Sequence, residues 1–137
     1  MNIRCGFCVP IFAAPGQWSF RTPNYDALDV PETLAMAVEA DALGYNSLWI
    51  ADHLQLVEDQ AIMEGWTTMA ALAGMTSRAQ LGLIHGANLL RHAAVTARAA
   101  MTFDQISNGR LIYFLAPNAG ENEQRAYGVD WPEPEHE

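Results

Sequence analysis

The segment Asn46-Ser-Leu-Trp-Ile-Ala-Asp-His53 decides how the rest of the chain is interpreted. Its apolar run, Leu48 to Ala51, does not alternate with polar residues and follows a helical pattern that stops at Gly44. Such a short run is typical of a strand buried on both faces, as in a parallel sheet. Asp52 and His53 follow at its carboxyl end, where ligands bind in α/β proteins. The alternative is that Asp52 caps the next segment and His53 forms a local hydrogen bond.

Outward from this strand, strand-like and helical stretches alternate along the chain. Strands are predicted at Asn2–Phe12, Leu48–Ala51, Gln80–Gly86 and Leu111–Leu115, with starts near residues 2, 46, 80 and 110. Helices are predicted at Pro31–Leu43, Trp66–Met75 and Ala93–Ile106. Ala119, Gly120 and Glu121 lead into a fourth helical start that runs through Tyr127 and Gly128. Asp29 and Gly44 are suited to cap the two ends of the first helix. Strand starts lie roughly 30 residues or more apart, which predicts right-handed βα units with parallel strands.

Composition and charge exclude several classes of function. The chain has 137 residues, half of them hydrophobic, so we expect one globular domain. Its net charge is −9, and all seven basic residues are arginine. This balance argues against nucleic acid or an anionic membrane as a partner. No apolar stretch reaches the roughly 18 residues that span a bilayer, and we identify no signal peptide, so we expect a cytoplasmic protein.

Cys5 and Cys8 form a C-x-x-C pattern, which is compatible with a redox pair or half of a zinc site. Residues three apart on a strand point to opposite faces, however, and no second cysteine pair follows. We therefore expect two small buried thiols and no metal site.

A long loop from Ala13 to Asp29 follows the first predicted strand and contains Trp18. Loops of this length in compact domains are often functional. Trp18 is assigned either to contact with a substrate or to packing of the loop over the sheet.

Six stretches together resemble the N-terminal half of the bacterial-luciferase-like flavin-dependent monooxygenases. They are Ser47-Leu-Trp-Ile-Ala-Asp-His53, Trp66-Thr-Thr-Met-Ala-Ala-Leu72, Thr76-Ser-Arg78, Leu81-Gly82, Arg91-His92 and Asp104-Gln-Ile-Ser-Asn-Gly-Arg110. Their order and spacing, rather than any single stretch, make the resemblance specific to the family. It extends from Ile3 to Pro132 and leaves the substrate open.

The resemblance implies a fold. The family has a TIM barrel, which needs eight strands and about 250 residues. The expected fold is therefore α/β, with parallel βα repeats that form half of a TIM (β/α)8 barrel in one luciferase-like domain over residues 1–137. Such a half barrel has two unpaired sheet edges and an apolar inner face. We therefore expect a homo-oligomer or a second chain that supplies the other half.

The resemblance also implies a reaction. The first hypothesis is an oxidoreductase that oxygenates a small organic substrate with reduced FMN and oxygen, with a flavin reductase as a candidate partner. The alternative cofactor is the deazaflavin F420, with which hydride transfer replaces oxygenation. A hypothesis from another class is a non-catalytic half barrel that assembles or binds a ligand.

Site residues follow from the same resemblance. Asp52 and His53 are expected to line the flavin or substrate pocket. Ile84 and His85 lie where many relatives place a cis peptide bond behind the flavin ring. We assign the catalytic polar groups to His53 and His85, and cofactor contacts to Asp52, Ile84 and His85.

The neighbouring loops supply further candidates. Arg91 is assigned to an anionic part of the flavin or substrate, or alternatively to orienting its loop, together with His92, by pairing with a carboxylate. Asn118 replaces a glycine that the family usually has after the fourth strand, and it is assigned a hydrogen bond to the flavin. Glu121 and Glu123 follow, near a position where the family has an acidic residue.

Overall fold

The computed structural model describes residues 3–13, 27–55, 62–116 and 120–131. The main sheet has four parallel strands in the order β1 (Gly6–Cys8), β2 (Ser47–Ile50), β3 (Gln80–Leu83) and β5 (Leu111–Ile112). A second, two-stranded parallel sheet joins β4 (Gly86–Ala87) to β6 (Leu115–Ala116). The parallel α/β fold predicted from the sequence is confirmed.

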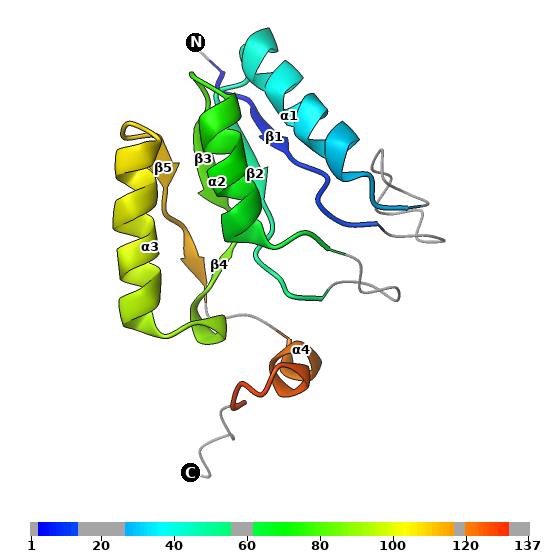
Figure 1. Ribbon diagram of the computed structural model, residues 1–137, viewed down its shortest axis with the longest axis vertical. Coiled ribbons are helices and arrows are strands. Elements are labelled where there is room, and N and C mark those ends of the chain that lie inside the picture. Colours follow the sequence, from blue (N-terminus) through cyan, green and yellow to red (C-terminus); the bar gives the residue numbers. More distant parts are fainter. Residues whose placement is uncertain (1–2, 14–26, 56–61, 117–119, 132–137) are drawn as a thin grey trace.

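Three helices lie along one face of the main sheet, as Figure 1 shows. They are α1 (Val30–Leu43), α2 (Gly65–Met75) and α3 (Ala93–Ile106). The short 3-10 helix η2 (Asn88–Leu90) precedes α3, and α4 (Glu121–Ala126) lies beyond the carboxyl ends of the strands (Figure 1). None of the described helices is long and apolar enough to cross a membrane.

Local signals determine where α1 begins and ends. The Asp29 side chain accepts the backbone N–H of Glu32 at 2.9 Å, and Gly44 closes the helix in the left-handed conformation with φ of 95°. Glycine adopts this conformation without the steric cost that a Cβ atom brings. Both caps are those that the sequence predicts.

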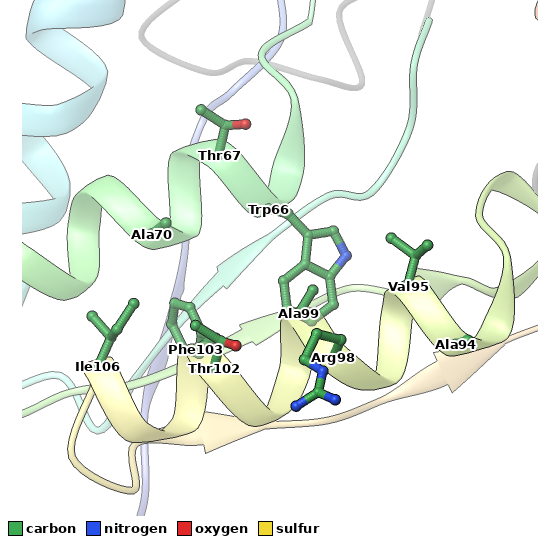
Figure 2. A pocket seen from close by; sticks show the side chains of 10 residues that line it. All are labelled: Trp66, Thr67, Ala70, Ala94, Val95, Arg98, Ala99, Thr102, Phe103 and Ile106. Carbon is green, nitrogen blue, oxygen red and sulfur yellow. The ribbon is translucent and has the colours of Figure 1, made fainter.

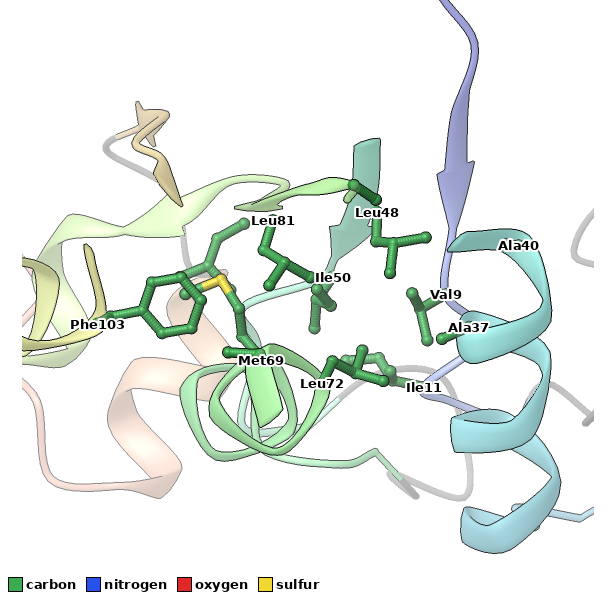
Figure 3. Packing of buried hydrophobic residues seen from close by; sticks show 13 residues of the cluster. Val9, Ile11, Ala37, Ala40, Leu48, Ile50, Met69, Leu72, Leu81 and Phe103 are labelled. Atoms are coloured by element: carbon green, nitrogen blue, oxygen red, sulfur yellow. The ribbon is translucent and has the colours of Figure 1, made fainter. Parts of the chain in front are cut away.

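The core lies between the sheet and the three helices (Figure 3). Its fully buried strand residues include Leu48, Ile50 and Leu81, which pack against Met69 and Leu72 of α2. Burial of each such side chain stabilises the fold by roughly 1.5–3 kcal/mol. The expectation that the central strand is buried on both faces holds only in part, because Trp49 between Leu48 and Ile50 is half-buried.

The predicted strands are longer than the observed ones. The predicted strand Gln80–Gly86 is interrupted after Leu83 and continues as β4, which pairs with β6 instead of β2. The predicted strand Leu111–Leu115 is divided into β5 and β6 in the same way. Strand length is decided by the neighbouring strands that accept hydrogen bonds, and a single sequence does not show which neighbours are present.

The expectation of buried cysteines is wrong. Cys5 and Cys8 are both free thiols with exposed side chains. Cys5 precedes β1 and Cys8 ends it, whereas the buried residues of this segment, Val9 and Ile11, follow the strand and belong to the core. Among the described residues β1 pairs only with β2, so it lies at an edge of the sheet, where its side chains are less enclosed.

A buried carboxylate joins α1 to the loop between α2 and β3. Asp41 is 7% exposed and accepts the backbone N–H groups of Ser77, Arg78 and Ala79 at 3.0, 3.2 and 2.6 Å. These amides have no helix or strand partner, so the carboxylate satisfies donors that are otherwise costly to bury.

We expect Asp41→Asn to lower the free energy of unfolding at pH 7 by about 1–3 kcal/mol, because a carboxamide cannot accept all three N–H groups. Urea unfolding measures this difference. Glu39→Gln, an exposed position on the same helix, is the matched control and should leave the free energy of unfolding nearly unchanged.

The effect should also depend on pH. Burial on its own raises the pKa of Asp41, but the three backbone amides and the charge of Arg78 outweigh it, and the pKa lies below 3.8. A carboxyl group with a lowered folded-state pKa stabilises the fold above its unfolded pKa, and this contribution is lost as the pH falls through the folded value. The difference between wild type and Asp41→Asn should therefore shrink below pH 3.8. A difference that persists unchanged there contradicts this account.

Candidate functional site

The site begins with an ion pair at the carboxyl end of β2. Asp52 is 1% exposed, and its two oxygens accept hydrogen bonds from Nη1 and Nη2 of Arg91 at 2.8 and 2.7 Å. Oxygen Oδ2 of Asp52 also accepts the backbone N–H of Ala87 at 2.8 Å. Asp52 thus faces the protein interior, and Arg91 makes the carboxylate pairing that the loop-orienting alternative requires.

A second carboxylate extends this pair to α2. Nη2 of Arg91 donates to Oε1 of Glu64 at 2.7 Å, while Oε2 of Glu64 caps the helix by accepting the N–H of Thr67 at 2.6 Å. Burial on its own raises the pKa of Glu64, but the hydrogen bonds from Thr67 and Arg91 outweigh it and hold the pKa below 4.5. Burial likewise disfavours charged Arg91, yet its two carboxylate partners raise its pKa. Glu64 and Arg91 are therefore both charged at neutral pH.

Close backbone contact brings these elements together. The start of α2 lies so near the end of β2 that a Cβ atom on Gly65 would be 2.7 Å from the carbonyl oxygen of Ala51. Only glycine fits there, and its absence of a side chain lets Glu64 lie within reach of Arg91. The end of β2, the start of α2 and the segment before α3 consequently meet at one point.

His53, the residue after Asp52, pairs with the last described helix. Its Nδ1 lies 2.9 Å from Oε2 of Glu123 on α4. Oε1 of Glu123 accepts the backbone N–H of Leu54 and, at 3.3 Å, that of Gln55. The Tyr127 hydroxyl adds a hydrogen bond to the carbonyl of Leu54 at 3.1 Å. These contacts attach α4 to the loop that carries His53.

His85 follows the neighbouring strand, β3. The peptide bond between Ile84 and His85 is cis, as the resemblance leads us to expect. The His85 side chain is exposed, and its ring lies edge-on to Phe114, with ring centroids 5.3 Å apart and an interplanar angle of 77°. Among the described residues no hydrogen bond connects His85 to the His53–Glu123 pair.

The remaining predicted residues have other positions. His92 lies at the N-terminus of α3, where its Nδ1 accepts the N–H of Ala94 at 3.2 Å, so it caps the helix. Trp18 and Asn118 lie outside the described residues.

A groove lies elsewhere, between α2 and α3 (Figure 2). It has a volume of about 730 Å³ and is lined mainly by apolar side chains, among them Trp66, Val95, Phe103 and Ile106. Trp66 and Phe103 meet edge-on there. The groove contains neither His53 nor His85, so volume alone does not identify the site.

Comparison with known proteins gives the family. The profile of the luciferase-like monooxygenases matches residues 9–137. The chain belongs to the luciferase-like monooxygenase family.

Curated proteins of known activity are similar to the chain in sequence. A phthiodiolone/phenolphthiodiolone dimycocerosates ketoreductase of Mycobacterium tuberculosis is 32% identical over 126 residues, covering 77% of this chain and 32% of the relative. An F420-dependent glucose-6-phosphate dehydrogenase of Amycolatopsis mediterranei is 33% identical over 100 residues, covering 71% of this chain and 30% of the relative. The chain thus spans about a third of the length of the curated relatives it matches.

Solved structures share the fold. The oxygenating constituent of 3,6-diketocamphane monooxygenase from Pseudomonas putida, in complex with FMN, has a TM-score of 0.71 and 22% identity, over 94% of this chain and 33% of that one. An F420-dependent secondary alcohol dehydrogenase with an F420-acetone adduct has a TM-score of 0.69 and 19% identity, over 96% of this chain and 36% of that one. At this identity the likeness concerns the fold, part of a TIM barrel.

Sequence reasoning missed two residues of this arrangement. Glu64 precedes the predicted helix Trp66–Met75, and its role as a helix cap becomes visible only with the start of α2 at Gly65. Glu123 stands out in the sequence only as an acidic residue after the fourth strand. Glu123 is 4% exposed. It lies on a short polar helix, so no hydrophobic pattern in the sequence predicts that it is buried.

We expect Arg91→Met to lower the free energy of unfolding by about 3–5 kcal/mol, because it leaves the buried Asp52 carboxylate without its counter-charge. Arg91→Lys should have a smaller effect, since lysine keeps the charge but lacks the planar fork that binds both oxygens. Urea unfolding measures both changes. Arg98→Met, at an exposed position on α3, is the control, and equal stability of the two methionine variants would show the network to be unimportant.

Proposed function

We propose that this chain supplies His53 and His85 to a cofactor-dependent oxidoreductase site at the carboxyl ends of β2 and β3. The observation that carries the proposal is the register of these two strands, in which Ile50 pairs with Leu83. Both histidines follow within three residues of that pair, so both lie just beyond the carboxyl ends of their strands, on the same side of the sheet. In α/β proteins this edge is where ligands bind.

The residues at this edge fit a flat cofactor ring. Phe114 and Leu115 are 47% and 44% exposed, and His85 packs against Phe114, so apolar surface and a polar ring lie side by side. A flavin or deazaflavin ring needs this combination of an apolar face and polar edge contacts. When bound, such a cofactor supplies the redox chemistry, and the protein positions it and excludes water. Asn118 and Trp18 remain proposed contacts to cofactor and substrate.

The anionic part of the cofactor requires a different partner from Arg91. Two carboxylates already surround the Arg91 guanidinium, whose side chain is 19% exposed. We therefore assign Arg91 and Asp52 to the framework that holds the site, in place of direct contact with a phosphate.

Of the two cofactors, we favour F420 with hydride transfer at a carbonyl or hydroxyl group. The support comes from two relatives above 30% identity, by name a ketoreductase and an F420-dependent dehydrogenase. FMN-dependent oxygenation is the alternative, and its support is the fold shared with an FMN-bound monooxygenase. For either reaction we propose that residues 1–137 belong to a single luciferase-like domain.

Titration of the chain with F420 and with FMN, followed by cofactor fluorescence, tests the proposal. Replacing His53 or His85 by alanine should weaken binding about 3- to 10-fold, the equivalent of one lost hydrogen bond. Gln105→Ala, on the exposed side of α3, is the control and should bind as wild type does. Binding of neither cofactor, or binding that both histidine variants leave unchanged, would remove the site from this chain.

Exposed sheet edges favour a second proposal, that the chain associates with itself or with another chain. In the described part of the protein β1 pairs only with β2, and β5 only with β3. Tyr113, Phe114 and Leu115 are each more than 40% exposed. Unpaired edges and exposed apolar side chains promote association, and this is also the arrangement that a non-catalytic module would use.

We expect sedimentation equilibrium at micromolar concentration and physiological salt to give a dimer or a larger assembly. Apolar contacts are not screened by salt, whereas the repulsion of a −9 charge is. A cooperative 15.0 kDa monomer that binds no hydrophobic dye would contradict this expectation.

A further inference from the structure

The contacts of Glu123 account for both of its carboxylate oxygens. Oε1 accepts two backbone N–H groups, from Leu54 and Gln55, and Oε2 faces Nδ1 of His53 at 2.9 Å. The Glu123 side chain is 5% exposed, so solvent does not compete appreciably for these positions. A carboxylate is an acceptor only, and a backbone N–H is a donor only. The hydrogen bond to His53 therefore has its proton on the histidine.

We propose that Glu123 is a positioning residue that fixes the tautomer of His53, with the ring proton on Nδ1 and with Nε2 as a hydrogen-bond acceptor toward the site. Nε2 lies across the ring from the glutamate, and the His53 side chain is 25% exposed. Within the described residues Nε2 has no hydrogen-bond partner. In neutral imidazole one nitrogen donates and the other accepts, so fixing the proton on Nδ1 fixes the role of Nε2.

This inference rests on the proposed function for its consequence. In the strand-end site, His53 offers an acceptor to a hydroxyl or N–H group of a bound cofactor or substrate. A ligand that presents only acceptors at that point is disfavoured, because the two lone pairs face each other. Glu123 makes this selection through His53 and does not touch the ligand.

The same contacts make α4 part of the site. Glu123 and Tyr127 both bind the loop that contains Leu54, and this loop is far from α4 in the sequence. The short helix is held to this loop by polar groups, and one of them sets the histidine tautomer. The same carboxylate thus attaches the helix to the loop and contacts the His53 ring.

The substitution Glu123→Gln is expected to change the tautomer of His53 while the protein stays folded. The carboxamide oxygen can still accept the N–H groups of Leu54 and Gln55, while its NH2 group becomes a donor toward His53. Nδ1 must then accept, so the ring proton moves to Nε2. The predicted result is an inverted tautomer in a folded protein. Glu121→Gln is the matched control, because Glu121 is exposed on the same helix and pairs with Arg125.

Long-range 1H–15N correlation spectra of the histidine rings distinguish the two tautomers. They are recorded at about pH 8, above the usual titration range of histidine. The chain has four histidines, and the His53 signals are assigned by their loss in His53→Asn. We expect Nδ1–H in wild type and in Glu121→Gln, and Nε2–H in Glu123→Gln.

Two results would overturn the proposal. The first is a wild-type His53 ring with its proton on Nε2, or with protons on both nitrogens, and it needs no variant. The second is an unchanged Nδ1–H tautomer in folded Glu123→Gln, which would show that Glu123 does not control the ring. The measurement needs no cofactor, so failure to bind F420 or FMN would count against the proposed function alone.

Discussion

The buried ion pair of Asp52 and Arg91 is the interaction on which the arrangement of the strand ends depends. Removing two charges from water costs several kcal/mol for each ion, and only good geometry with further hydrogen bonds offsets that cost. Here the guanidinium binds both carboxylate oxygens, and the Ala87 N–H and Glu64 complete the shell. Asp52 directly precedes His53, and Ala87 lies two residues after His85. The pair therefore fixes both histidine-bearing segments in one framework.

Carboxylates have the same structural use in several loops of this acidic chain. Asp41, Asp52, Glu64 and Glu123 each accept at least one backbone N–H that lacks a partner in a helix or strand. A net charge of −9 suggests a solvated acidic surface, but these four groups hold loops together internally. Arginine complements them, because its fork reaches several acceptors at once. Arg110, for example, binds carbonyl oxygens of Ala73, Ala79 and Ser107.

The position of the site follows from the topology and not from the size of the cavities. Parallel strands place their carboxyl ends together, which brings the segments after β2 and β3 to one edge. The large apolar groove lies between α2 and α3, and neither His53 nor His85 lines it. Fold class and helices were predictable because family motifs and caps are local features. The partners of the predicted site residues were not, since Asp52 and Arg91 are 39 residues apart and His53 and Glu123 are 70 apart.

The sequence by itself determined the parallel βα order, the family and the helix limits. The prediction for α3, Ala93–Ile106, agrees with the structure, and α1 differs by one residue, because capping residues act within a single turn. Only the tertiary structure decided which strands break, that the cysteines are exposed, and that Asp52 points inward while His53 meets α4. These outcomes depend on hydrogen-bond partners from distant segments, and the free energy of a buried charge is set by what the folded chain places beside it.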